Sequence, residues 1–160
     1  MKFTLTLLLM AAMSANAGEM NLSYGKTKSL GEEVYMLSSK YGKRFYIEPV
    51  IGAFEAMRQG ELKQVKFGGA ALGWRVKKKK AAASISLGRI QLGRATDRLS
   101  TKGQFLITSE IARRDKGNIF AVGWKHISNG AGIKVARELF GARKPNKGED
   151  WFYVMVGTEF

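Results

Sequence analysis

The stretch WKHISN at positions 124–129 places His126, the single histidine of the 160-residue chain, two residues before Ser128. On a β-strand such residues point to the same face, with Cα atoms about 6–7 Å apart. The imidazole can then reach the hydroxyl and act as its general base, which makes the serine a nucleophile. The plainer alternative is a histidine that forms hydrogen bonds at an apolar–polar boundary beside Trp124. The spacing alone leaves both interpretations open.

Several other kinds of site are excluded by the sequence. One histidine and no cysteine rule out zinc sites built on those ligands. A dinucleotide-binding fingerprint needs a third glycine, but Gly130 and Gly132 are followed by Val135. No Gly-x-Ser-x-Gly motif occurs, which excludes the serine arrangement of soluble α/β-hydrolases.

The elements that would position these residues are β-strands, because apolar and polar residues alternate along the chain. Apolar residues recur at every second position around 45–47, 70–76, 85–87, 105–111, 120–124 and 152–160, with weaker runs at 21–26 and 33–37. Residues typical of turns separate them at 39–42, 58–60, 77–80, 94–103 and 113–117. These runs predict about eight strands, the smallest usual number for an outer-membrane barrel.

Two all-β architectures fit this pattern, and the polar faces of the strands distinguish them. A soluble sandwich or lipocalin-like barrel turns its apolar face inward, whereas a membrane barrel turns it outward around a narrow polar lumen. The faces opposite the apolar ones carry Arg75, Ser84, Glu110, Lys125, Glu159 and many of the 19 glycines. We therefore predict that residues 18–160 form one all-β domain, an eight-stranded antiparallel transmembrane outer-membrane β-barrel. A terminal Phe160 in phase with the lipid face is typical of such barrels.

The N-terminal residues 1–17 have the layout of a secretory signal peptide: Lys2, an apolar run and the ending Ala15-Asn16-Ala17. Export, together with the absence of cysteine, predicts a bacterial outer-membrane location for a chain that begins at Gly18 after cleavage. The net charge of +14 favours an anionic partner, and for an exported protein acidic lipid or lipopolysaccharide is expected rather than nucleic acid. The run Lys77–Lys80 is interpreted as a solvated periplasmic turn rather than a lipid-headgroup site.

Two segments near the C-terminus, KHISNGAG and KPNKGEDWFYVMVGTEF, resemble the C-terminal signature of the lipid A 3-O-deacylase (PagL) family. Members of this family are eight-stranded outer-membrane barrels with His-x-Ser-Asn, then Pro-Asn-x-Gly, then an acidic residue that opens the last strand. The resemblance runs from Gly123 to Phe160. It implies a serine esterase that hydrolyses the 3-linked hydroxyacyl chain of lipid A, without metal or organic cofactor, and it suggests a homodimer.

The resemblance also implies a role for each site residue. Ser128 is the nucleophile, His126 is the base, and Glu149 or Asp150 is the acid that orients the imidazole. Asn146 and a backbone N–H near Gly132 form the implied oxyanion hole. Residues 133–144, between the two motifs, are interpreted as a surface insertion rather than a lid.

The two candidate acids must point to opposite faces of a strand because they are adjacent. Asp150 is in phase with the lipid-facing residues Phe152 and Val154, as His126 and Ser128 are on the preceding strand. Glu149 shares the lumenal face with Tyr153. The phase therefore favours Asp150 as the triad acid, with Glu149 as the alternative. A function of another class is a non-catalytic structural or adhesive barrel that binds lipopolysaccharide without cleaving it.

Overall fold

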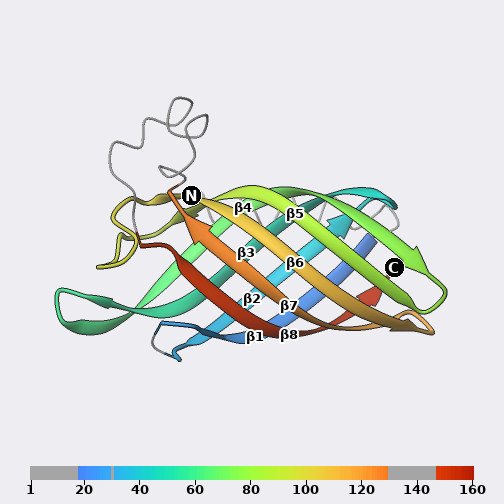
Figure 1. Cartoon of the computed structure of the whole chain (residues 1–160), viewed down its shortest axis with the longest axis horizontal. Coiled ribbons are helices and arrows are strands. Elements are labelled where there is room, and N and C mark those ends of the chain that lie inside the picture. Colours follow the sequence, from blue (N-terminus) through green and yellow to red (C-terminus); the bar gives the residue numbers. More distant parts are fainter. Residues whose placement is uncertain (1–17, 30, 130–146) are drawn as a thin grey trace.

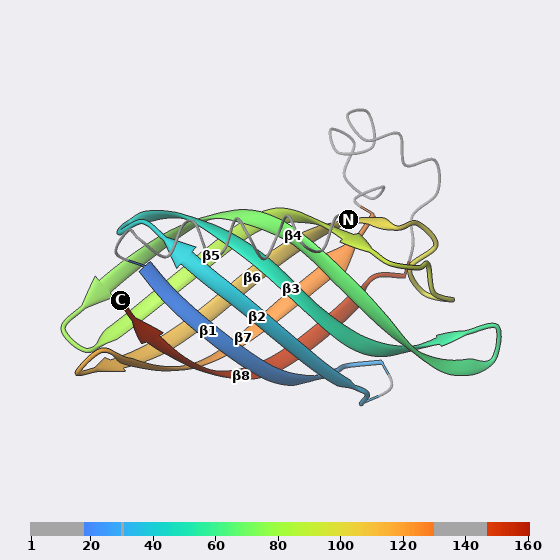
Figure 2. The same cartoon turned by 180° about the vertical axis from the view of Figure 1, so that it is seen from behind.

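A computed structural model shows that the chain forms a closed barrel of eight antiparallel strands, in which each strand pairs with its neighbours in sequence and β1 pairs with β8 (Figures 1 and 2). The structure describes residues 18–29, 31–129 and 147–160, so the predicted signal peptide at 1–17 lies outside it. The strands are β1 (Gly18–Thr27), β2 (Glu33–Tyr41), β3 (Phe45–Arg58), β4 (Glu61–Lys78), β5 (Ala81–Leu92), β6 (Gly103–Asp115), β7 (Asn118–Ser128) and β8 (Glu149–Glu159). The predicted fold class is confirmed. In the described part of the chain, no helix has the length and apolar character needed to span a bilayer.

The outer wall of the barrel is apolar, as the alternation predicts. Large hydrophobic side chains on it are exposed, among them Phe45, Leu72, Ile111, Phe120 and Val154. An apolar outer face fits a lipid environment, because the hydrocarbon of the membrane contacts these side chains and no other protein segment has to cover them.

The two ends of the barrel differ. Gly18 and Phe160 lie at one end, where they exchange backbone hydrogen bonds of 2.9 and 3.0 Å and where the connections are the short turns 42–44, 79–80 and 116–117. The connection 93–102, the projecting β3–β4 hairpin, the end of β1, the start of β2, the end of β7 and the start of β8 lie at the other end (Figure 1). In outer-membrane barrels the short turns are periplasmic and the long loops extracellular. Ser128 and Asp150, at the end of β7 and the start of β8, lie at the end that corresponds to the extracellular end of such barrels, and we name the two ends of this barrel accordingly.

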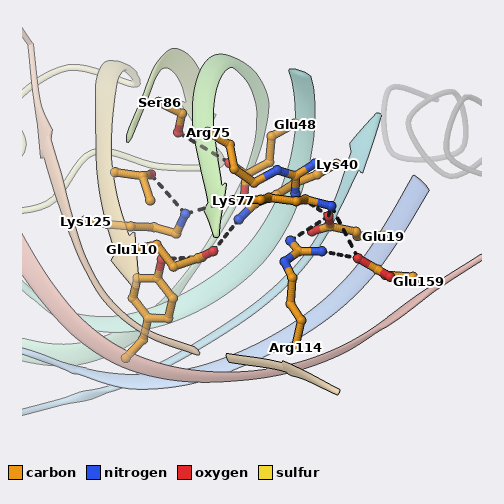
Figure 3. Close-up of polar contacts among 12 residues, drawn as sticks. Glu19, Lys40, Glu48, Arg75, Lys77, Ser86, Glu110, Arg114, Lys125 and Glu159 are labelled. Atoms are coloured by element: carbon orange, nitrogen blue, oxygen red, sulfur yellow. Dashed lines mark hydrogen bonds and ion pairs between the residues drawn. The ribbon is translucent and has the colours of Figure 1, made fainter. Parts of the chain in front are cut away.

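The middle of the lumen holds buried ion pairs rather than water-exposed charges (Figure 3). Lys40 Nζ lies 2.6 Å from Glu110 Oε1, and the hydroxyl of Tyr153 donates to Glu110 Oε2 at 3.0 Å. Lys125 Nζ lies 3.7 Å from Glu48 Oε1. These contacts join β2, β3, β6, β7 and β8 across the barrel. The predicted lumenal positions Glu110 and Lys125 are confirmed.

A second group of charges fills the periplasmic end of the lumen. Glu19 binds Arg75 and Arg114, and Glu159 binds Arg114 and Lys77 (Figure 3). Arg75 is buried and also donates to the backbone carbonyls of residues 42 and 43, which holds the β2–β3 turn in place.

Three predicted turns extend too far into strands: residues 77–78 belong to β4, residues 113–115 to β6 and residues 39–41 to β2. The last is the largest departure, because Lys40 is 1% exposed inside the lumen. A Ser-Lys-Tyr-Gly sequence resembles a turn when read locally. Its lysine is instead neutralised by Glu110, which is 70 residues away in the sequence.

The extracellular end of the lumen is filled by apolar side chains. The Trp151 ring lies 5.2 Å from the rings of Phe54 and Phe67, and Leu99 of the 93–102 connection is fully buried in the same cluster. The lumen is thus apolar beneath the start of β8 and polar further in. This packing gives the first residues of β8 a rigid inner support.

We expect Glu110→Gln to lower the free energy of unfolding by about 3 kcal/mol, because it leaves the buried Lys40 ammonium without its carboxylate. Urea unfolding of the protein in lipid vesicles, followed by tryptophan fluorescence, measures this change. The control is Asp115→Asn, which removes the exposed Lys80–Asp115 pair of 2.7 Å and should cost less than about 1 kcal/mol. Equal effects of the two variants would contradict the structural role of the lumenal pair.

Candidate active site

The site on the outer wall is built where β7 and β8 lie side by side at the extracellular end. His126 and Asp150 are directly opposite each other in the register of these strands, and His126 Nδ1 lies 2.9 Å from Asp150 Oδ1. Both side chains are partly buried, with 30% and 28% of their surfaces exposed. A carboxylate on Nδ1 favours the tautomer that carries its proton there, which leaves Nε2 able to accept a proton.

Trp124 supports both members of this pair. Its indole Nε1 donates to Asp150 Oδ1 at 3.0 Å, and its ring stacks on the imidazole with a centroid distance of 5.9 Å. Asp150 Oδ1 therefore contacts both ring nitrogens, Trp124 Nε1 and His126 Nδ1, and the stacked indole restricts the orientation of the imidazole. The spacing of two residues predicts that Trp124 lies on the same strand face as His126. It does not predict the hydrogen bond from Trp124 to Asp150, which depends on how β7 pairs with β8.

Ser128 is the last residue of β7 and lies on the same face as His126, two residues further toward the extracellular end. It pairs with Phe105 of β6, so apolar wall continues beside it. Its side chain is partly exposed. Both side chains are thus on the outer face of β7, which is the placement that the alternation predicts, and among the described residues the imidazole's hydrogen-bond partner is Asp150 rather than Ser128.

Gly148 lies against the edge of the imidazole. A Cβ at this position would be 2.9 Å from His126 Cε1 and 3.3 Å from Nε2, and the residue has a φ of +66°. Only glycine meets both conditions without strain, because it has no side chain and adopts positive φ readily. The backbone at 148 therefore packs closely on the ring while leaving space at the proton-accepting nitrogen.

Glu149, the alternative acid, points away from the imidazole. It is 5% exposed on the lumenal side, where its Oε2 lies 2.8 Å from Arg98 Nε and its Oε1 accepts from the backbone N–H of Ser29 at 3.2 Å. Arg98 Nε also donates to the carbonyl of Gly148 at 3.2 Å. Asp150 is thus the acid that contacts His126. Glu149 instead binds Arg98 and so connects the 93–102 segment to the start of β8.

The remaining predicted residues cannot be placed in the same way. Asn146, Gly132 and the predicted insertion 133–144 lie outside the described residues. Asn129, which follows the serine, is described and is buried.

We expect Gly148→Ala to reduce any activity of His126 by on the order of ten- to a hundredfold, because the added Cβ displaces the imidazole and small misplacements of a catalytic group are costly. The matched control is Gly60→Ala in the β3–β4 turn, where φ is +78° and nothing lies within 4 Å of the added Cβ. The control carries the same backbone penalty, roughly 1–2 kcal/mol for an L-residue in the left-handed conformation. A similar loss in both variants would show that backbone strain, not ring placement, is responsible.

The fold defines a class of protein: eight-stranded barrels of the outer membrane, here with a histidine–carboxylate pair on the outer wall. No family model matches the chain, and no curated protein matches its sequence. Among solved structures, the barrel is similar to the outer membrane enzyme PagL, with a TM-score of 0.65 and 14% identity over 88% of this chain and 98% of PagL. It is also similar to Neisserial surface protein A (NspA), with a TM-score of 0.54 and 11% identity over 90% of this chain and 96% of NspA. At these identities the similarity shows the fold that the three proteins share.

Proposed function

We propose that this protein is a lipid A 3-O-deacylase, a serine esterase that hydrolyses the 3-linked hydroxyacyl chain of lipid A. The observation that carries the proposal is the 2.9 Å contact between His126 and Asp150, on the same outer face as Ser128. A histidine held by a carboxylate beside a serine hydroxyl is the arrangement that activates serine for acyl transfer. The sequence signature around these residues, which resembles that of the deacylase family, supports the same reaction.

The proposed reaction proceeds through an acyl-enzyme. His126 Nε2 takes the proton of the Ser128 hydroxyl while Oγ attacks the ester carbonyl carbon. The bond between that carbon and the 3-oxygen of the sugar then breaks, and the imidazolium returns its proton to the departing oxygen. Water, deprotonated by His126, then attacks the acyl carbon. The bond from that carbon to Ser128 Oγ breaks, Oγ takes the proton back from the imidazolium, and the 3-hydroxy acid leaves. Asp150 stabilises the imidazolium in both steps, and Asn146 with a backbone N–H near Gly132 is the proposed oxyanion hole.

The position of the site favours a membrane lipid as substrate. The hydroxyl and imidazole are on the lipid-facing wall, and polar groups on that face are costly unless they are near the interface or have a function. Exposed apolar residues of β7 and β8, Val122, Phe152 and Val154, continue from the site toward the membrane centre. An acyl chain can lie along them while its ester reaches Ser128. The extracellular end faces the leaflet in which lipid A resides.

The alternative is a non-catalytic barrel that binds lipopolysaccharide. The similarity of the fold to Neisserial surface protein A supports this alternative. Incubation of the purified, folded barrel with lipopolysaccharide, followed by mass spectrometry of the lipid A, separates the two functions. Loss of the mass of one hydroxyacyl chain supports the esterase. Unchanged lipid A that stays bound to the barrel supports the alternative.

The proposed substrate requires export, which the N-terminal sequence predicts. We expect outer-membrane fractions to contain a mature chain that starts at Gly18 and whose gel mobility shifts on heating, as folded barrels do. N-terminal sequencing and a heated–unheated gel comparison measure both properties. Recovery of the chain in the soluble periplasm would contradict the proposed location.

A further inference from the structure

We propose that the periplasmic end of the outer wall binds an anionic phospholipid, in a groove formed by the β4–β5 turn, β6 and β7. This site is independent of the proposed esterase activity, which is located at the opposite end of the barrel. The groove has a volume of about 590 Å³, with the lysines of the β4–β5 turn and Arg113 at its rim and Ala81, Ile111, Phe120 and Val122 along its floor. Its composition is that of an amphipathic ligand site, with cations at the rim and hydrocarbon on the floor. The groove beside the turn is the reason to propose a headgroup site where the sequence alone favoured a merely solvated turn.

The floor of the groove arises from the sizes of paired residues. Ala81 of β5 is opposite Arg113 of β6, which in turn is opposite Phe120 of β7. One pair further into the membrane, Ile111 is opposite Val122. The small methyl group of Ala81 leaves a depression beside the larger neighbours, which are 65% (Ile111), 56% (Phe120) and 59% (Val122) exposed. A hydrocarbon chain packs naturally into such a depression on a lipid-facing wall.

The rim of the groove carries four cations. Lys80 is paired with Asp115 at 2.7 Å. Among the described residues, no carboxylate forms an ion pair with Lys78, Lys79 or Arg113, in contrast to the neighbouring Lys77 and Arg114, which bind Glu159. The rim therefore presents three positive charges whose counter-ion must come from outside the barrel.

The orientation of the barrel identifies the counter-ion. The groove lies at the end that holds both termini and the short turns, which is the periplasmic end. Lysine and arginine side chains at a membrane surface attract anionic headgroups. The phosphodiester of an acidic phospholipid such as phosphatidylglycerol reaches the rim when its acyl chains lie over Phe120 and Ile111. Lipid A, in the opposite leaflet, does not reach it.

The turn itself is well suited to a test by charge removal. Lys79 has a φ of +51°, in the left-handed region, and Gln59 adopts the same conformation in the β3–β4 turn with a φ of +55°. Glutamine is therefore compatible with this backbone. The variant Lys78→Gln/Lys79→Gln/Arg113→Gln removes three rim charges, and the matched control Lys28→Gln/Lys63→Gln/Lys102→Gln removes three charges at the extracellular end.

The experiment equilibrates the detergent-solubilised barrel with equal amounts of phosphatidylglycerol and phosphatidylcholine and quantifies the retained lipids by mass spectrometry. We expect the lipid retained by the wild type and by the control variant to be enriched in phosphatidylglycerol over phosphatidylcholine. In the rim variant this enrichment should be about tenfold smaller. Ala81→Phe, which fills the groove without changing charge, should reduce retention of both lipids. Heat-shifted gel bands confirm that each variant is folded.

Three results would overturn the proposal: a retained lipid ratio equal to that supplied, unchanged enrichment in the rim variant, or an equal loss in the control variant. The last result would assign the preference to the net charge of the whole protein. If the triple rim variant does not fold, the single variants Lys79→Gln and Arg113→Gln carry the same test, each with a smaller loss of enrichment. Deacylation by these variants should equal that of the wild type.

Discussion

Ser128→Ala should reduce the rate of the proposed lipid A deacylation by about a thousandfold or more, since the proposed serine nucleophile has no substitute in the site. His126→Ala should have an effect of the same size, because without the base the hydroxyl is not activated. The double variant should be little worse than either single variant, as is expected of residues that act in one step. Release of 3-hydroxy acid from lipopolysaccharide, measured over time, gives the rates.

The barrel should remain folded in both variants. Neither side chain belongs to the lumenal ion pairs or the apolar cluster that connect the strands. The heat-dependent gel shift and the urea unfolding curve should therefore match those of the wild type. Turnover by folded Ser128→Ala at more than a few per cent of the wild-type rate would exclude Ser128 as nucleophile.

Asp150→Asn should lower the turnover rate by on the order of a thousand- to ten-thousandfold with little change in lipid binding. The asparagine amide can donate to His126 Nδ1, which selects the tautomer with the proton on Nε2 and leaves that nitrogen unable to accept the serine proton. It also removes the charge that stabilises the imidazolium. Comparison of kcat with KM measures the effect, and the loss should appear in kcat.

Glu149→Gln is the matched control for Asp150→Asn, because it changes the adjacent carboxylate in the same way. Glu149 is bound to Arg98 and to the backbone of Ser29 rather than to His126. We expect its turnover to stay within a few-fold of the wild type, with some loss of stability from the broken ion pair. If the two variants showed the reverse order, the acid of the triad would be Glu149.

The fold could be predicted from the sequence because a membrane barrel repeats one simple rule along every strand. Apolar residues at alternate positions identified the strands, and charges on the opposite face identified a polar lumen. The rule fails where a contact is made at long range. Lys40 resembles part of a turn until Glu110, on a strand across the lumen, is seen beside it. The apolar cluster around Trp151 was not expected, since alternation predicts which face a residue is on but not which residues meet there.

The same distinction holds at the site: alternation predicts which face of the wall a residue is on, whereas strand pairing decides which residues meet there. The alternation of apolar and polar residues along β8 predicts that Asp150 is on the outer wall with His126 and Ser128. The register that sets His126 directly opposite Asp150 depends on pairing along the whole of both strands. The contributions of Trp124 and Gly148 follow from that register, so they could be found only in three dimensions. Arg98 comes from a connection 50 residues before Gly148, which no local pattern links to the site.

Hydrolysis of lipopolysaccharide in ¹⁸O-labelled water, with mass spectrometry of both products, tests the central proposal most directly. Attack of Ser128 on the ester carbonyl, followed by hydrolysis of the acyl-enzyme, predicts lipid A that lacks only the 3-linked hydroxyacyl chain. It also predicts a released 3-hydroxy acid that carries one oxygen from the labelled water. Ser128→Ala should give neither product. Lipid A of unchanged mass with the folded wild type, or a released acid without the label, would contradict the proposed esterase.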